Sequence, residues 1–344
     1  MREPAPMVRR NRVKTALLTI ALVALVGCGP VTSVVREGAP PAASLTGPNV
    51  AALTVPAPSV RQAAETPAGR ILFVRDGNLW LWNAGNSRQF SEGHTWHQPA
   101  FSPGGKEIAY VYWADNFSDI FVIAADGSST RRLTKGQSSS LPDNIWAFRP
   151  SWSPNGERIA YVSDATSQFN QVWLMNPDGE NRRQLTSEMS GFQWVDSLTW
   201  EPSGARIAVT AARAMGEPSH IYVIDVAEGS SEKLSTQTNG AFDPAWSPDG
   251  DMIAYIGRPG QVGTLWVSNL DGTKTAQLDK LQYVRSPAWS PDGKSLAVLA
   301  THSGIFEIWI VPVNRTDAGY EFGEPRQLTR EAAIDPLSGL TWAP

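Results

Sequence analysis

The sequence predicts an all-β fold, a six-bladed β-propeller of four-stranded blades, and three observations lead to it. One aromatic residue recurs six times within the same local pattern. Each copy is followed by a tight turn and then by short apolar strands. The two ends of the repetitive region hold complementary parts of one more repeat. The recurring aromatic residues are Phe101, Trp152, Trp200, Trp246, Trp289 and Trp342.

The first strand of each repeat carries this aromatic residue. Successive copies lie 43 to 53 residues apart, which is a period typical of propeller blades with four strands each. A proline or leucine stands two positions before the aromatic residue, as in Pro244-Ala245-Trp246. We expect the first strands to lie innermost in the ring, as in propellers generally.

A tight turn then leads into the second strand. In the segment 247–250, Ser-Pro-Asp-Gly, proline presets φ, aspartate can accept bonds from backbone amides, and glycine adopts a conformation that other residues resist. The turn aspartates are therefore interpreted as structural. A second strand of the Ile-Ala-Tyr type, a third centred on an aromatic residue such as Trp266, and a short fourth strand complete the unit.

The ends of the repetitive region predict how the ring closes. Residues 70–74, 78–82 and 88–90 match a second, third and fourth strand without a first, and residues 340–344 match a first strand alone. Together they form a sixth blade shared between the two ends. Closure in this way removes the sheet edges that an open array would expose.

The N-terminal segment predicts export and lipid attachment. Basic residues precede the apolar run 15–27, which is too short for an ordinary membrane-spanning helix. The run ends at Cys28 in a sequence that resembles the bacterial lipobox. We expect residues 1–27 to be a lipoprotein signal peptide, residues 28–66 to be the lipidated cysteine and a flexible tether, and residues 67–344 to be the propeller. The domain would then be extracytoplasmic, anchored to the cell membrane or to the outer membrane if the host has one.

Composition excludes several functions. Cys28 is the only cysteine, so a disulfide within the chain and a thiolate cluster in the folded domain are both excluded. Without residues 1–27 the chain holds 24 basic and 32 acidic residues, a net charge of −8. A nucleic-acid partner is not expected of so acidic a domain.

The repeated pattern PxWSPDGxxIAY resembles the TolB-type propeller repeat, and the resemblance covers nearly all of residues 67–344. It implies six blades and a protein-binding module of the bacterial cell envelope. TolB itself has a small α/β domain before its propeller, which residues 29–66 are too short to supply, so its own partners are not carried over. The repeat also occurs in prolyl-oligopeptidase-like peptidases. No GxSxG motif is present and the chain ends at the last strand, so their activity is not expected.

Function is expected on one face of the ring. The loops that enter the first strands and those that join second to third strands share this face, and their lengths vary; we call it the variable face. Nine of the fourteen tryptophans occupy repeat positions within strands. Trp96, Trp146, Trp194 and Tyr283 instead stand just before first strands, with His97, Asp243 and Arg285 in equivalent places. We predict that these seven residues ring the channel mouth and form the ligand-binding surface; packing of the rings onto the propeller rim is the alternative.

The sequence therefore predicts a binding or scaffolding module, monomeric and without cofactor, whose ligand is an envelope protein, a peptide or a glycan. The alternative is a metal-dependent lyase or hydrolase that acts on carbohydrate or peptide and uses His97 with His302 at the channel mouth. No catalytic or metal-binding set is evident. The residues directly before the six recurring aromatic residues, where the blades converge, are all small: Ala100, Ser151, Thr199, Ala245, Ala288 and Thr341.

Overall fold

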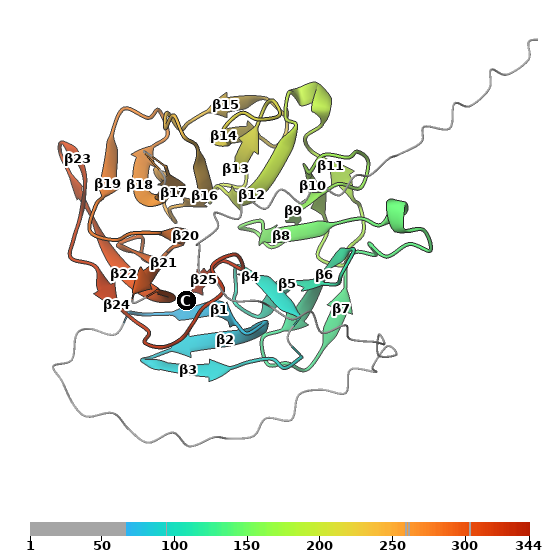
Figure 1. Ribbon diagram of the computed structural model, residues 1–344, viewed down its shortest axis with the longest axis horizontal. Coiled ribbons are helices and arrows are strands. Elements are labelled where there is room, and N and C mark those ends of the chain that lie inside the picture. Colours follow the sequence, from blue (N-terminus) through green and yellow to red (C-terminus); the bar gives the residue numbers. More distant parts are fainter. Residues whose placement is uncertain (1–66, 94, 259, 261, 303) are drawn as a thin grey trace, which may run out of the picture. The chain divides into compact units, whose positions relative to one another are not determined.

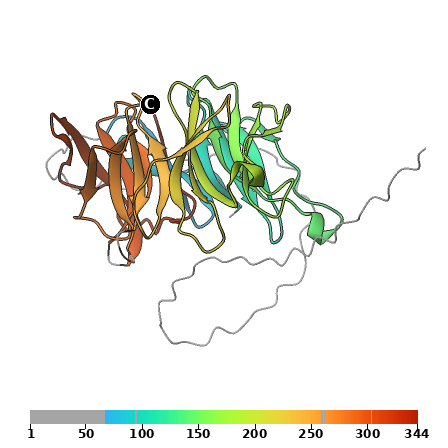
Figure 2. The same cartoon turned by 90° about the horizontal axis from the view of Figure 1, so that it is seen from above.

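The computed structural model describes residues 67–344 except for 94, 259, 261 and 303. The predictions for the signal peptide, Cys28 and the tether lie outside these residues. The described part is a closed ring of six antiparallel sheets, with the first strand of each blade innermost (Figure 1). The predicted six-bladed propeller is confirmed. Turned by 90°, the ring shows its strands running between the two faces (Figure 2).

The first three blades each have four strands. Blade 1 contains β25 (Thr341–Ala343), β1 (Arg70–Arg75), β2 (Asn78–Asn83) and β3 (Asn86–Gln89). Blade 2 contains β4 (Trp96–Phe101), β5 (Glu107–Trp113), β6 (Ser118–Ala124) and β7 (Thr130–Arg132). Blade 3 contains β8 (Ala147–Trp152), β9 (Ile159–Ser163), β10 (Gln171–Met175) and β11 (Arg183–Gln184).

The last three blades repeat this order. Blade 4 contains β12 (Trp194–Trp200), β13 (Arg206–Ala212), β14 (His220–Asp225) and β15 (Ser231–Lys233). Blade 5 contains β16 (Ala241–Trp246), β17 (Met252–Gly257), β18 (Thr264–Asn269) and β19 (Thr275–Leu278). Blade 6 contains β20 (Arg285–Trp289), β21 (Ser295–His302), β22 (Ile305–Thr316), β23 (Gly319–Phe322) and β24 (Arg326–Gln327).

Blade 6 differs from the simple repeat. Its third strand, β22, is twelve residues long, and both β23 and β24 pair with it. Strand β24 occupies the place of the fourth strand, and β23 is an added hairpin partner of the far half of β22. The repeat pattern did not predict this hairpin, because its sequence has no counterpart in the other units.

The shared blade forms as predicted from the two complementary fragments. Strand β25 pairs antiparallel with β1, with Ile71 opposite Trp342. The indole Nε1 of Trp342 donates a hydrogen bond to the carbonyl oxygen of Ala68 at 2.9 Å, and Arg70 Nε donates to the carbonyl oxygen of Pro344 at 3.0 Å. The last and first described segments are thus joined by backbone and side-chain bonds.

The core lies between adjacent blades, because the apolar faces of neighbouring sheets pack together. One buried cluster, for example, combines Val111 and Ile120 of blade 2 with Ile159 and Tyr161 of blade 3. The recurring tryptophans also join blades: Trp200 Nε1 donates to the carbonyl oxygen of Ser151 at 3.1 Å. Trp289 Nε1 donates in the same way to Ala245 at 3.0 Å.

The Ser-Pro-Asp-Gly turns are structural, as the sequence predicts. Asp249 Oδ1 accepts hydrogen bonds from the Ser247 hydroxyl and the Asp251 amide. Gly250 has φ +83°, and a Cβ there would lie 3.8 Å from the ring of Pro202 in the preceding blade. Stacked turns of this kind cover the face opposite the variable face and leave it uniform.

Helix is scarce in the described chain. It is limited to two three-residue 3-10 turns, η1 (Leu141–Asp143) and η2 (Glu188–Ser190), both in loops of the variable face. No helix among the described residues is long and apolar enough to cross a membrane.

Candidate functional site

The exposed large apolar side chains of the described residues all belong to the variable face. Antiparallel pairing places the loops that enter first strands and the loops that join second to third strands at the same edge of every blade. Each of these side chains lies in such a loop or at its junction with a strand: Leu141, Met189, Trp194, Met215, Tyr283, Ile305 and Leu337. Apolar side chains gathered on one face are typical of protein-interaction surfaces.

Five of these seven residues were not in the predicted set. Leu141 and Met189 lie in the 3-10 turns before β8 and β12, and Met215 lies between β13 and β14. Met189 is 99% exposed and Met215 is 81% exposed. Their position in loops of variable length was the available signal, whereas the predicted set contains only aromatic, histidine and charged residues that stand just before first strands.

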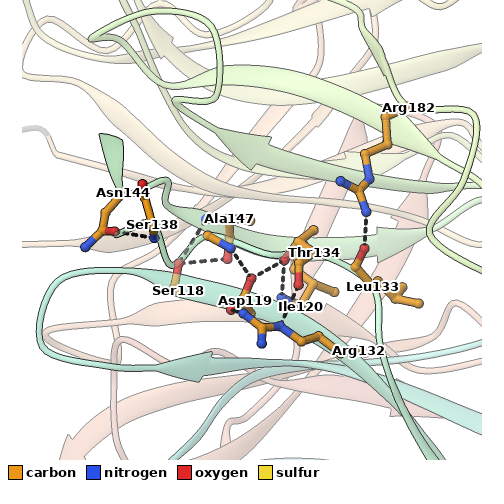
Figure 3. Close-up of polar contacts among 11 residues, drawn as sticks. Ser118, Asp119, Ile120, Arg132, Leu133, Thr134, Ser138, Asn144, Ala147 and Arg182 are labelled. Carbon is orange, nitrogen blue, oxygen red and sulfur yellow. Dashed lines mark hydrogen bonds and ion pairs between the residues drawn. The ribbon is translucent and has the colours of Figure 1, made fainter. Parts of the chain in front are cut away.

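The loop that carries Leu141 is fixed at its base (Figure 3). Asp119, which is buried at the start of the third strand of blade 2, accepts hydrogen bonds from the Gly136 amide at 2.7 Å and the Thr134 hydroxyl at 2.8 Å. The Ser118 hydroxyl donates to the Ala147 carbonyl oxygen of blade 3. Bonds at the base of the loop reduce the backbone entropy that the loop would lose on binding a partner.

The predicted aromatic residues fall into two groups. Trp194 is 45% exposed and Tyr283 is 53% exposed, so both rings are accessible. Trp146 is half-buried directly before β8, where its amide donates to Asp164 Oδ1 at 2.8 Å. Trp96 stacks on Tyr110 at 4.1 Å between ring centroids, packs against the core of blades 1 and 2, and donates through Nε1 to the Glu92 carbonyl oxygen. These contacts favour a packing role for Trp96.

His97 lies apart from the other predicted polar residues. Its ring lies 4.8 Å from that of Trp113, and its Nδ1 is 3.2 Å from Ser338 Oγ and 3.7 Å from Asp335 Oδ2. Burial raises the pKa of Asp335, but hydrogen bonds from His97 and Ser338 outweigh it and hold this pKa below its usual range.

Serine, histidine and aspartate meet here without the geometry of a nucleophilic triad. In a triad the serine hydroxyl donates to the imidazole, whereas the Ser338 hydroxyl donates to Asp335 Oδ2 at 2.5 Å. Within the described residues, no group of three or more His, Cys, Asp or Glu side chains could hold a metal ion. His302, the second histidine of the enzymatic alternative, ends β21, and its side chain is not among those described.

The first strands share a backbone irregularity that brings polar side chains to the axis. In blades 2, 3, 5 and 6 the register with the second strand shifts three residues before the recurring aromatic residue. The residue at this place has positive φ although it is not glycine. It also directly precedes a proline, and helical conformations are normally disfavoured for the residue before a proline. These residues are Gln98, Arg149, Asp243 and Ser286, with φ between +47° and +53°.

Side chains at these bulges connect successive blades. Gln98 Oε1 accepts the amide of Arg149 at 2.9 Å, and Asp243 Oδ2 accepts the amide of Ser286 at 3.3 Å. The amide of Asp243 itself donates to the Thr210 hydroxyl at 3.1 Å. Asp243, which the sequence predicts as a ligand-binding residue, therefore has a structural role in the ring.

Charged side chains meet near these bulges. We call Arg149, Asp196, Asp243, Arg258 and Arg285 the axial cluster; only Asp243 and Arg285 were in the predicted set. Arg149 Nη2 lies 3.9 Å from Asp243 Oδ1, although the two residues belong to blades 3 and 5. Contact between blades that are not neighbours requires proximity to the axis of the ring, so Arg149 and Asp243 lie near the axis. The charges of Arg149, Asp243 and Arg285 act on Asp196, and those of Asp243 and Arg285 act on Arg258, so these residues are assigned to the same cluster.

Comparison with known proteins agrees with this architecture. Residues 141–257 match the family described as the TolB beta propeller domain. Crystalline TolB from Acinetobacter baumannii superimposes with a TM-score of 0.63 at 20% identity, over 80% of this chain and 67% of that one. The described ring is therefore a β-propeller whose fold is similar to that of TolB.

Two curated relatives match parts of the TolB-like propeller. The Tol-Pal system protein TolB of Gluconobacter oxydans is 38% identical over 104 residues, which cover 29% of this chain and 22% of that protein. An uncharacterized protein of Agrobacterium fabrum is 29% identical over 170 residues, which cover 47% of this chain and 54% of that protein. The chain thus spans about half or less of the length of these relatives.

Proposed function

We propose that this protein is a binding module of the bacterial cell envelope that captures an envelope protein on its variable face. One observation carries the proposal: the exposed large apolar side chains of the described residues belong to that face. The opposite face is covered by short, stereotyped turns. The TolB-like propeller and a relative named as a Tol-Pal system protein support an envelope setting.

The N-terminal segment completes the proposal. Signal-peptide cleavage after residue 27 and lipidation of Cys28 would hold the propeller at a membrane outside the cytoplasm, with residues 28–66 as tether. The support is the order of basic residues, apolar run and cysteine in the sequence. Mass spectrometry of the N-terminal peptide from native membranes would detect the lipid.

Site-specific photo-crosslinking tests the binding face. A photoreactive residue placed at Met189 or Met215 should crosslink a discrete envelope protein in intact cells, and the same residue at the exposed turn positions Glu180 or Asp271 should not. Equal crosslinking from both faces would contradict the proposal.

Aromatic contacts on the same face provide a second arm of this test. Truncation of an aromatic anchor to alanine typically costs about 2 kcal/mol or more of binding free energy. Trp194→Ala combined with Tyr283→Ala should therefore reduce crosslinking from Met189 strongly, with little change in melting temperature, since both rings are exposed. Lower stability with unchanged crosslinking would assign the two rings to packing.

A further inference from the structure

Three arginines of the axial cluster make no hydrogen bond to a described side chain, although the guanidinium of Arg258 lies over the ring of Phe242 at 4.4 Å. Arg149 belongs to β8, Arg285 begins β20, and Arg258 directly follows β17. Among the described residues, no side chain accepts a hydrogen bond from any of the three. The nearest approach is the 3.9 Å separation between Arg149 Nη2 and Asp243 Oδ1. Three cations therefore lie near one another with their donors unused.

Arg149 is largely enclosed. Its side chain is 19% exposed, and its Nε is shielded from solvent without an acceptor. Its Nη1 lies 3.6 Å from the place a Cβ would occupy on Gly339 of blade 1, so the guanidinium extends across the axis. A buried donor without an acceptor costs about 1–3 kcal/mol, and an oxygen-bearing ligand at this place would satisfy it.

The aspartates of the cluster do not neutralise these cations. Asp196, in the bulge of β12, makes no hydrogen bond or ion pair with any described side chain. Burial raises the pKa of Asp196; Arg149 and Arg285 oppose this shift, and Asp243 adds to it. Burial also lowers the pKa of Arg258, and the charge of Arg285 lowers it further. Three positive groups thus face at most two negative ones, all partly desolvated.

The backbone beneath the cluster is held by hydrogen bonds between blades. Arg149 and Asp243 both have positive φ directly before proline, a conformation that costs about 1–3 kcal/mol and persists only where its surroundings hold it. The inter-blade bonds to the amides of Arg149 and Ser286 supply that support. The same bulge occurs in other blades, so its backbone strain is a general feature of the repeat. The bulges of the axial cluster differ from the others in the charge of their side chains.

We propose that the axial cluster binds the carboxylate of an acidic side chain on a segment of the protein partner, inserted at the axis from the variable face. This deepens the proposed function and rests on it. Arginine presents a planar fork of donors that fits a carboxylate. With both aspartates ionised the cluster has one net positive charge, which a bound monoanion such as a carboxylate would neutralise. A phosphate dianion would leave the occupied site with a net negative charge.

The test uses the full-length chain with labelled arginine side chains, followed by NMR of the Nε–Hε groups. The probe is glutamate acetylated at its amine and amidated at its carboxyl terminus, so that one carboxylate is its only charge. A saturable shift of the Arg149 signal is expected, and none with the matching glutamine derivative.

Arg149→Gln and Arg285→Gln should each weaken probe binding about tenfold or more, and Arg149→Lys should weaken it less. The control Arg88→Gln removes an equal charge on exposed β3 and should change nothing.

Each outcome decides a different claim. No saturable shift, or a shift that survives both Arg149→Gln and Arg285→Gln, overturns the site. Tighter binding of inorganic phosphate than of the glutamate derivative overturns the choice of a carboxylate. If the probe binds but Arg149→Gln leaves crosslinking from Met189 unchanged, the carboxylate does not come from the partner, and the proposed function still stands. If the photoreactive residue at Met189 gives no crosslink even without the Arg149→Gln change, the proposed function is refuted, and the partner as source of the carboxylate is refuted with it, while probe binding at the cluster is judged by the NMR experiment alone.

Discussion

At the residue scale, the axial cluster holds charged side chains in partly buried places, which lowers the free energy of unfolding. Asp196 is the clearest case, because its carboxyl group lies near Arg149, Asp243 and Arg285 and yet has a raised pKa, with burial as the largest cause. A carboxyl whose pKa is higher in the folded chain than in the unfolded chain binds its proton more tightly when folded. The free energy of unfolding therefore falls as the pH rises through the folded-state pKa.

Asp196→Asn removes this penalty. The variant should melt at a higher temperature than the parent at pH 7, and the difference should shrink as the pH is lowered toward about 4, the ordinary pKa of aspartate. Calorimetry at a series of pH values measures both effects. The substitution should also tighten binding of the glutamate derivative, since it removes a nearby negative charge. A melting difference that does not depend on pH would show that ionisation of Asp196 is not its cause.

At the scale of single elements, the start of each third strand fixes the loops of the variable face. In blade 2 this is β6, where the side chain of Asp119 is 1% exposed and bonds to Arg132, Thr134 and Gly136. The hydroxyl of Thr134 in turn accepts the amide of Ile120 at 2.9 Å. Equivalent bonds recur at Thr186 in blade 3 and Thr329 in blade 6. This hydrogen-bond arrangement is therefore a feature of the fold, and it holds the base of the loop that follows each fourth strand.

Asp119→Ala should destabilise the protein by about 2–4 kcal/mol, because it leaves buried donors without an acceptor. The matched control is Glu107→Ala, which breaks the ion pair with Arg131, where both side chains are about one third exposed. Exposed pairs contribute about 0–1 kcal/mol. Urea unfolding of the two variants measures the contrast. Similar losses in both would mean that the Asp119 bonds add little beyond an ordinary surface pair.

At the scale of the whole molecule, stability depends on closing the ring. Strand β25 is only three residues long, yet it completes blade 1 and covers one edge of β1. An uncovered edge presents unpaired backbone groups and favours aggregation. In a repeat protein it also weakens the interfaces on both sides of the incomplete unit.

Deletion of residues 340–344 should therefore lower the melting temperature, broaden the unfolding transition and promote aggregation. Leu337→Ser, at an exposed position three residues before the deleted segment, should leave all three unchanged. Scanning calorimetry and light scattering follow these quantities together. A truncated protein that unfolds like the parent would mean that β25 adds nothing to closure.

The sequence by itself determined the ring. The spacing of the aromatic residues, the turn motif and the complementary end fragments are local patterns, and each blade repeats them, so strand order and closure could be inferred without coordinates. The same reasoning identified the variable face, because alternating loops of an antiparallel blade must share one edge. It could not identify the hairpin of β23, which occurs once and outside the repeat.

Only the tertiary structure decided which side chains share a place on that face. Trp96 and Trp194 have similar positions in sequence, but one stacks on Tyr110 and the other is nearly half exposed. Arg149 and Asp243 lie 94 positions apart and come within 3.9 Å because their bulges bring them across the axis from blades that are not neighbours. Sequence periodicity specifies the position of a residue within its own blade. Contacts across the axis depend on the curvature of the closed ring and on the rotamers of long side chains, which no single repeat encodes.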